Sequence, residues 1–449
     1  MFGNSHSVEQ RVRKNRVYAA LAAATIFVMC MWYYSAHKST ISSGGTRVTN
    51  LSLSTKSPYL APNTTSRSAP SDLELVQVQY IYRHGARYPT LDDMAHIKDI
   101  YGLDGLSVPN DWINTEHIDG DKAVLLAKYG YREMTGLAQR ILQRYPTFLV
   151  ERMRDSELVR FVSSEFQRSY MSARTFQGVV DPSNYTRPVT ALPQEEDTIL
   201  YMKAACPAWV HGKGAAADNA SREIAVFDAA HGQGLRQRMS GKLGVKSDLL
   251  TVSHISTLYT MCGYEVSLFA QPDTWCTLFD PDTSALMELR NDIKYSRVYG
   301  PFGASINKKM ACALFSAIFR DIDGALRDSP RAISTFRFGH AETLMFVSTL
   351  LELEQMLGTE NSPIIGAMPP SLAQHRGFKT SVIAPFSTNL GIELYKDQHA
   401  QPFFRLLLNE RAIRLKECAD EFCPLDVLRN KLGDSIDCDF ASVCRITPQ

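Results

Sequence analysis

One strand-like run and the heptapeptide after it constrain this chain most. Leu73–Tyr82 is rich in Val, Tyr and Leu, and Arg83-His84-Gly85-Ala86-Arg87-Tyr88-Pro89 follows it directly. Such a run favours a β-strand, and Gly and Pro end it. The last side chains of such a strand lie at the carboxyl edge of the sheet, where open α/β sheets bind ligands. Arg83 and Arg87 suit phosphate oxygens, and His84 can carry a covalent intermediate, so the segment predicts a phosphate site.

A second segment repeats this geometry later in the chain. Gly339-His340-Ala341-Glu342 ends a predicted strand, Ala332–Phe338, and precedes the apolar run Leu344–Leu357. A strand end followed by a helix start places polar groups at a helix N-terminus, which favours anions. We therefore expect the two segments to meet at one site.

The two segments resemble the signatures of a known family. Arg-His-Gly-x-Arg-x-Pro is the motif of the histidine acid phosphatases. Most of that superfamily has His-Asp at the second motif, but this chain has Ala341 there and Glu342 one residue later. His-Ala-Glu is the variant of the multiple inositol polyphosphate phosphatases, which the chain resembles over about Leu75 to Val427. Ala86 departs from the Thr common in the family, but it does not alter the catalytic groups.

The resemblance implies a metal-free, two-step phosphoryl transfer without a cofactor. His84 is the implied nucleophile, and Glu342 is the implied proton donor to the leaving inositol oxygen. A proton donor must carry its proton before the reaction, so we expect burial to raise the pKa of Glu342. The groups implied to hold the phosphate oxygens are Arg83, Arg87, Arg168 and His340. Weaker matches to the family are Asp119-Gly120, Gly130, Ser163-Ser164, Ser172-Ala173 and Cys423-Pro424-Leu425-Asp426.

The pattern of elements predicts an α/β fold. Helices are expected at 91–100, 122–144 and 168–179, with strands at 157–162, 388–395 and 403–409. Strands that alternate with helices indicate an α/β core with helices on both faces of its sheet. Residues from about 193 to 330 are more helical, so we expect an inserted, mainly helical cap. The resemblance implies that residues 72–449 form a histidine phosphatase domain of this kind.

The N-terminal part predicts a membrane anchor. Residues 1–16 carry four basic side chains and one acidic one, and Val17–Ala36 holds twenty uncharged, mostly apolar positions. Such a run can cross a bilayer, and the preceding positive charge keeps the N-terminus cytosolic. A signal peptide cleaved near Ser35-Ala36 is the alternative, which would give a secreted protein. Residues 37–71 are rich in Ser, Thr and Pro and predict a flexible stalk.

Sequons and cysteines favour a lumenal or extracellular body. The candidate glycosylation sites Asn50, Asn63, Asn184 and Asn219 all follow the apolar run. Eight cysteines follow it as well, and no zinc-type C-x-x-C or H-E-x-x-H pattern appears, so the cysteines are predicted to be structural. Eight cysteines allow 105 pairings. Close spacing favours Cys262–Cys276 and Cys418–Cys423, with Cys438–Cys444 as a weaker candidate. We expect the secretory pathway and the plasma membrane, since no retention signal ends the chain.

Charge excludes one class of partner and leaves two alternatives for function. The formal net charge is +1, which argues against nucleic acid as a partner and in favour of a local site for a small polyphosphate. One alternative is a broad acid phosphatase for small monoesters or lysophospholipids. The other is a cell-surface ectodomain that binds polyanions without turnover. The retained nucleophile and acid speak against the second.

Overall fold

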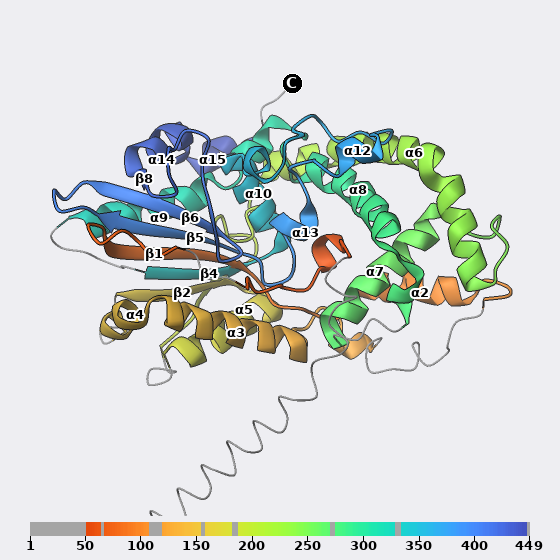
Figure 1. Ribbon diagram of the computed structural model, residues 1–449, viewed down its shortest axis with the longest axis horizontal. Coiled ribbons are helices and arrows are strands. Elements are labelled where there is room, and N and C mark those ends of the chain that lie inside the picture. The colour runs from red at the N-terminus through yellow and green to blue at the C-terminus, as the bar shows by residue number, and fades with distance from the viewer. Residues whose placement is uncertain are drawn as a thin grey trace, which may run out of the picture. The chain divides into compact units, whose positions relative to one another are not determined.

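A mixed β-sheet organises the described part of the chain (Figure 1). The computed structural model describes residues 51–63, 67–106, 119–153, 158–181, 187–269, 274–327 and 334–446. Its eight-stranded sheet has the order β3-β2-β4-β1-β5-β6-β7, and β8 pairs with β6. β1, β2, β3 and β4 pair in parallel, whereas β5 runs antiparallel to β1. The strands are β1 (Glu74–Arg83), β2 (Val159–Ser164), β3 (Thr190–Leu192), β4 (Ser334–Gly339), β5 (Asn389–Lys396), β6 (Pro402–Leu408), β7 (Arg411–Ile413) and β8 (Cys423–Pro424).

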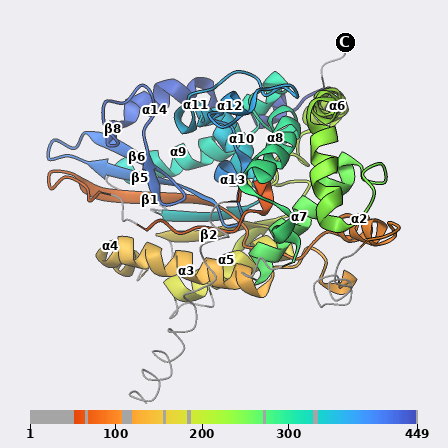
Figure 2. The same ribbon diagram turned by 45° about the vertical axis from the view of Figure 1, so that its right-hand side comes forward.

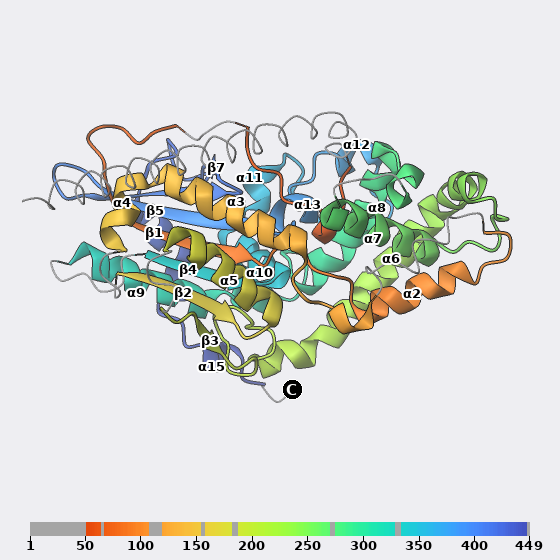
Figure 3. The same ribbon diagram turned by 90° about the horizontal axis from the view of Figure 1, so that it is seen from below.

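Helices cover both faces of the sheet, as the sequence predicted (Figures 1 and 3). α3, α4 and α5 pack on one face, while α9, α10 and α14 pack on the other. The helices are α2 (Leu91–Tyr101), α3 (Lys128–Arg144), α4 (Pro146–Arg152), α5 (Gln167–Val180), α6 (Pro207–Leu243), α7 (Val252–Phe269), α8 (Pro281–Val298), α9 (Cys312–Leu326), α10 (Ala341–Leu351), α11 (Glu354–Leu357), α12 (Pro370–Ala373), α13 (Thr380–Ile383), α14 (Leu425–Leu432) and α15 (Phe440–Val443). Short 3₁₀ turns are η2 (Ser54–Lys56), η4 (Gly120–Lys122), η6 (Trp275–Leu278), η7 (Ser305–Lys308) and η8 (Gly433–Ser435).

The alternating side chains of β1 explain why the sheet is covered twice. Successive side chains of a strand point to opposite faces. Val78, Tyr80 and Tyr82 therefore pack with α3 and α5, whereas Ile81 packs with α9 and α10. All four are fully buried, so β1 is a central strand with an apolar layer on each side.

Helices α6, α7 and α8 form a helical layer beyond the carboxyl end of the parallel strands (Figures 1 and 2). They match most of the cap that the sequence predicted at 193–330. One boundary of that prediction is wrong: α9 packs on the sheet with Leu314, Phe315 and Ile318 in the same core as β5. The apolar stripe of α9 was visible in the sequence, but its burial partner was not.

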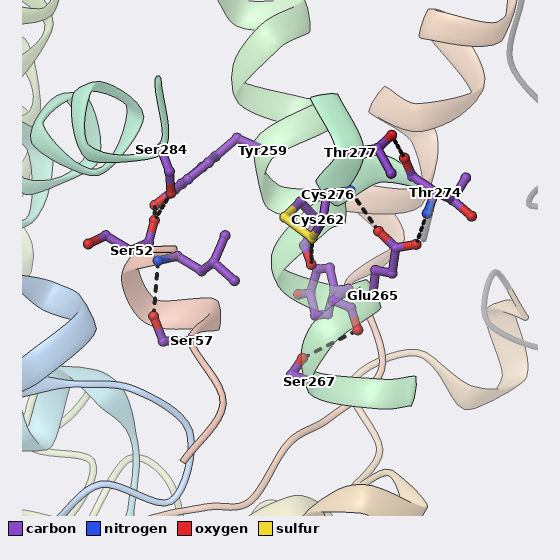
Figure 4. Close-up of a disulfide and its surroundings, with 12 residues drawn as sticks. Ser52, Ser57, Tyr259, Cys262, Glu265, Ser267, Thr274, Cys276, Thr277 and Ser284 are labelled. Carbon is purple, nitrogen blue, oxygen red and sulfur yellow. Dashed lines mark hydrogen bonds between the residues drawn. A yellow bond between two sulfur atoms is a disulfide. The ribbon is translucent and has the colours of Figure 1, made fainter. Parts of the chain in front are cut away.

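The predicted stalk is wrong for its later part, because residues 51–63 belong to the fold. Leu53, Ser54 and Thr55 are buried, although the sequence placed the start of the domain near Asp72. The carbonyl oxygen of Ser52 accepts hydrogen bonds from the hydroxyls of Tyr259 on α7 and Ser284 on α8 (Figure 4). A Ser- and Thr-rich segment is thus held by polar contacts with the cap helices, which composition alone does not reveal.

Four disulfides link the eight cysteines of residues 206–444. Cys262–Cys276 and Cys418–Cys423 confirm the pairs expected from close spacing. The first of these joins α7 to η6, where Glu265 accepts hydrogen bonds from the backbone of Thr274 and Cys276 (Figure 4).

The weaker pairing, Cys438–Cys444, is wrong. Cys444 pairs with Cys206, and Cys438 pairs with Cys312. The cause is tertiary: the C-terminal segment packs against the start of α6, where the Ala208 N–H donates to the Cys444 carbonyl oxygen. Proximity in sequence therefore did not decide these two bridges.

The N-terminal predictions lie outside the described residues, including the basic tail 1–16, the apolar run Val17–Ala36 and Asn50. Within the described ranges, no helix has both the length and the apolar character needed to cross a bilayer. Asn184 also lies outside them. Asn63 and Asn219 are exposed, and Asn219 lies on α6; their glycosylation stays a prediction.

Candidate active site

The two predicted motifs lie side by side because β1 and β4 are parallel neighbours. Arg83 pairs in register with Gly339, and the His84 N–H donates to the Gly339 carbonyl oxygen at 3.0 Å. The rings of His84 and His340 are consequently 5.5 Å apart, centroid to centroid, at an interplanar angle of 69°. The expectation that two strand ends far apart in the chain would meet is confirmed.

Two glycines let the first motif turn at this point. A Cβ atom at position 130 would lie 2.3 Å from the Ala86 carbonyl oxygen, and one at position 85 would lie 2.6 Å from the Gly130 carbonyl oxygen. Larger residues at either position would push the start of α3 away from the motif. The glycines therefore allow the backbone to approach closely where the histidine must be placed.

Two polar side chains from the covering helices fix the backbone of the motif. Glu133 on α3 is buried and accepts hydrogen bonds from the Ala86 N–H at 2.8 Å and the Ser387 hydroxyl at 2.7 Å. Ser172 on α5 accepts from the Gly85 N–H at 3.1 Å. Sequence reasoning missed Glu133, whose only signal was a charged residue one turn after Gly130.

One ring nitrogen of His84 is held by the backbone of its own motif. Its Nδ1 lies 2.8 Å from the Gly85 carbonyl oxygen. Because a carbonyl can only accept, Nδ1 carries the hydrogen, and the lone pair remains on Nε2. Burial, together with the charges of Arg168 and Arg83, lowers the pKa of His84 well below its ordinary value. This shift favours the neutral ring.

His340 is held at both ring nitrogens. Nε2 lies 2.9 Å from the Ser164 hydroxyl, and Nδ1 lies 3.4 Å from a terminal nitrogen of Arg168. Phe166 and Tyr201 pack edge-on against the ring at 4.9 and 5.1 Å. Burial and the neighbouring Arg168 lower the pKa of His340 as well. Ser164 belongs to a weak family match that the sequence did not link to His340.

Arg83 is anchored by η2 and by the residue that follows α13. Its Nη1 donates to the carbonyl oxygens of Thr55 at 2.5 Å and Ala384 at 2.6 Å, and its guanidinium stacks on Phe386 at 4.2 Å. The side chain is buried, and its Nε has no hydrogen-bond partner within the described residues. Burial and the charge of Arg87 lower the pKa of Arg83 to about 9.

Arg87 connects the motif to the cap. Its Nη1 donates to the Tyr88 carbonyl oxygen at 2.7 Å and to the Tyr264 hydroxyl on α7 at 3.0 Å. Tyr264 in turn donates to Asp93 on α2 at 2.8 Å. Despite burial, these two acidic partners raise the pKa of Arg87. Tyr264 was not foreseen, because nothing in the cap sequence marks it.

Arg168 lies in the first turn of α5, directly after β2, and its charge reaches both histidines. Its guanidinium also lies 4.5 Å from the Phe166 ring. Burial and the charge of Arg87 lower the pKa of Arg168 to about 10. The structure thus brings every residue proposed from the resemblance to one place: Arg83, His84, Arg87, Arg168, His340 and Glu342.

The expected state of Glu342 is wrong in this structure. Lys203, in the turn before α6, donates from Nζ to Glu342 Oε1 at 2.5 Å. Although burial alone would raise the pKa of Glu342, the ammonium group and His340 lower it well below the ordinary range. The carboxyl group is therefore ionised here. Lys203 lies 139 residues from its partner in the chain, so no local pattern predicted the pair.

A further cation comes from the segment predicted as a stalk. Lys56 lies 5.3 Å from the Tyr264 ring, and burial with the charge of Arg87 lowers the pKa of Lys56 to about 7. It lines a cavity of about 320 Å³, together with Thr55, whose carbonyl oxygen accepts from Arg83, and Asp93, which accepts from Tyr264. Other polar side chains that line this cavity are His96, Asn291, Lys294 and Tyr295. Among the described residues, no group of His, Cys, Asp or Glu side chains is arranged to hold a metal ion.

Comparison with known families agrees with this geometry. The model of the histidine phosphatase superfamily, branch 2, matches residues 74–409. The chain belongs to this superfamily. Its match begins at β1 and ends just after β6, so both motifs fall inside it.

Two curated relatives and one solved structure resemble this family member over most of its length. Multiple inositol polyphosphate phosphatase 1 of Gallus gallus is 24% identical over 409 residues, covering 86% of this chain and 88% of the relative. The Homo sapiens protein of the same name is 25% identical over 408 residues, covering 83% and 82%. The Bifidobacterium longum multiple inositol polyphosphate phosphatase, solved with inositol hexasulfate, superposes with a TM-score of 0.66 at 15% identity, covering 89% and 100%.

Proposed function

We propose that this protein is a metal-independent phosphomonoesterase that removes phosphates from inositol polyphosphates, such as inositol hexakisphosphate, through a phosphohistidine. The observation that carries the proposal is the set of cations around His84. Burial and the charge of Arg87 each lower the pKa values of Arg83, Arg168 and Lys56. Cations that repel one another are stabilised by a polyanion, so this site favours a substrate with several phosphates.

The geometry supports an in-line transfer to His84. Nε2 attacks phosphorus while the arginines neutralise the equatorial oxygens, which supplies most of the catalysis in such transfers. As the bond between phosphorus and the leaving oxygen breaks, Glu342 gives that oxygen a proton. In the second step Glu342 accepts a proton from water, which attacks the phosphohistidine and releases phosphate.

The surroundings support a substrate larger than one phosphate. A cavity of about 320 Å³ is lined by Lys56, His96 and Lys294, and by Thr55, whose carbonyl oxygen accepts a hydrogen bond from Arg83. It gives room for phosphates other than the one that reacts. Curated relatives named for inositol polyphosphates align over more than four fifths of the chain, which agrees with this substrate class.

Hydrolysis of inositol hexakisphosphate by the purified full-length protein tests the proposal. We expect release of orthophosphate at acidic to neutral pH, with ring-bound phosphates lost in sequence as seen by chromatography. No release over that range would contradict the proposal. A comparison of kcat/KM with an aryl phosphate separates it from a broad acid phosphatase, which would prefer the smaller ester. A binding ectodomain without turnover would bind inositol hexakisphosphate and release nothing.

We also propose that the catalytic domain lies in the lumen of the secretory pathway or outside the cell, held by Val17–Ala36 as a type II anchor. The disulfide pairing of the eight cysteines supports an oxidising compartment. Glycosidase treatment of protein from a eukaryotic host should lower its mass, and the mass of the N-terminal peptide separates an anchor from a cleaved signal. A cytosolic, unglycosylated product would contradict this location.

A further inference from the structure

Lys203 is a cation of the site that forms an ion pair with Glu342, the proposed proton donor. The segment between β3 and α6 carries it, and the same segment places Tyr201 against His340. The Nζ atom lies 2.5 Å from Glu342 Oε1 and over the rings of Tyr201 and Tyr299 at 5.0 and 5.9 Å. About a fifth of the Lys203 side chain and a quarter of the Glu342 side chain are exposed. The pair is therefore partly open to solvent.

This contact holds the proton donor in the wrong state for its role. A general acid must be protonated when substrate reacts, yet the neighbouring charges favour the carboxylate. The groups that share an electrostatic interaction with Glu342 are cations, His340 and neutral phenols, and burial opposes the effect of the cations. They are Lys203, His340, Arg168, Arg83, Arg87, Lys56, Tyr295 and Tyr299.

We propose that Lys203 is a positioning residue that couples the protonation of Glu342 to the arrival of a phosphorylated substrate. Before substrate binds, Lys203 keeps Glu342 as a carboxylate. A phosphate dianion competes for the ammonium group, and Lys203 exchanges its bond to Oε1 for one to a phosphate oxygen. This inference rests on the proposed function and adds to it a control over when the acid becomes active.

The proton follows from the same exchange. Glu342, now beside a dianion and without its cation, takes up one proton from solvent. That proton passes to the leaving oxygen when the bond between phosphorus and oxygen breaks and the bond between phosphorus and His84 Nε2 forms. A water molecule later restores the proton to Glu342, so the charges balance over the cycle.

Proton uptake during binding tests the coupling. Inositol hexasulfate is a suitable probe because its sulfate esters do not titrate at mildly acidic pH, so protons taken up are bound by the protein. Calorimetric titration of the full-length protein in two buffers of different ionisation heat gives the number of protons taken up on binding. We expect the wild-type protein to take up about one proton more than Glu342→Gln, because the glutamine has no site for it. Equal uptake by the two proteins would overturn the proposal.

Substitutions of Lys203 give a second readout from the pH dependence of inositol hexakisphosphate hydrolysis. The basic limb of kcat/KM reports the free enzyme, and that of kcat reports the complex. For the wild-type protein, the two basic limbs should be separated: kcat/KM should fall at a lower pH than kcat. Lys203→Met should raise the pH of the kcat/KM limb by about 1 unit or more and narrow the gap. Lys203→Arg keeps the cation and should keep the gap.

Lys308 offers a matched control. It forms an exposed ion pair with Glu352 at the other end of α10, with Nζ 3.0 Å from Oε1. Lys308→Met should leave both limbs in place. If Lys203→Met weakens binding but moves neither limb, Lys203 only binds phosphate and the coupling is refuted. Wild-type hydrolysis would still stand in that case, so the two proposals can fail separately.

Discussion

The ends of β1 and β4 are adjacent, but they are held in different ways. At the β1 end, the motif's own backbone and the covering helices α3 and α5 fix His84: Nδ1 donates to Gly85, and Glu133 accepts from Ala86. At the β4 end, an ion pair to a separate segment holds Glu342. The proposed nucleophile is therefore fixed by its own segment, whereas the proposed acid is fixed by an ion pair. In the proposed mechanism His84 is preorganised at the first end, whereas Glu342 loses its ion pair to Lys203 at the second.

The largest effect should come from replacing His84, at the end of β1. His84→Ala removes the group that accepts phosphorus, so kcat for inositol hexakisphosphate should fall by at least about 10³-fold. Unchanged thermal unfolding would show that the loss is chemical. Binding of inositol hexasulfate should persist, since the arginines remain. A variant that keeps more than a tenth of the wild-type rate would refute the role of His84.

Removing the acid should have a smaller effect that depends on the leaving group. Glu342→Gln should lower kcat for inositol hexakisphosphate by about 10²- to 10⁴-fold, the range for general acid catalysis. An aryl phosphate, whose leaving oxygen is far less basic, should lose much less. Steady-state rates on the two substrates make the comparison. Equal losses on both would mean that Glu342 acts on phosphate binding rather than on the leaving group.

Arg168 lies between the two ends and should affect them together. Arg168→Ala removes donors to the phosphate oxygens and should lower kcat/KM by about 10²-fold. Arg168→Lys keeps the charge but loses the planar fork, so its loss should be intermediate. Rates and orthophosphate inhibition constants should change in parallel. If Arg168→Lys proved as active as wild type, charge alone would explain the role of Arg168.

The smallest effect concerns the contribution of the ion pair between Lys203 and Glu342 to stability. The pKa of Glu342 is lowered in the folded protein, so its contribution is present above the ordinary value of 4.5 and is lost as pH falls toward the folded pKa. The pKa of Lys203 is raised, so the contribution of Lys203 to stability is complete below the ordinary lysine pKa of 10.5. The free energy of unfolding of the wild-type protein should exceed that of Glu342→Gln by about 1 kcal/mol at neutral pH. The difference is small because the pair is partly exposed. Chemical denaturation should show this difference shrinking below pH 4.5; a constant difference would contradict the pairing.

The local sequence predicted the surroundings of His84 better than those of Glu342. The strand, the motif and the turn at Gly85 are consecutive, so their order fixes His84 and its neighbours. Parallel pairing then places His340, because both motifs end strands of one sheet. The ion pair of Glu342 depends on Lys203, and no spacing marks a contact across 139 residues.

The same limit applies to the edges of the domain. Lys56 sits in a Ser- and Thr-rich segment that composition assigns to a stalk, yet cap helices bury its neighbours. The bridges Cys206–Cys444 and Cys312–Cys438 close loops of 238 and 126 residues, so nearness in sequence could not indicate them. Residues that depend on tertiary packing were missed, while residues that follow a strand end were found.

Trapping the covalent intermediate tests the central claim most directly. Full-length protein would be mixed with ³²P-labelled inositol hexakisphosphate, quenched under denaturing alkaline conditions that preserve phosphohistidine, and mapped by peptide mass spectrometry. We predict label on the peptide that contains His84 and none there in His84→Ala. When a ³²P-labelled aryl phosphate replaces inositol hexakisphosphate, Glu342→Gln should still be labelled on His84. Phosphate release without label on His84, or with label on another residue, would contradict the account.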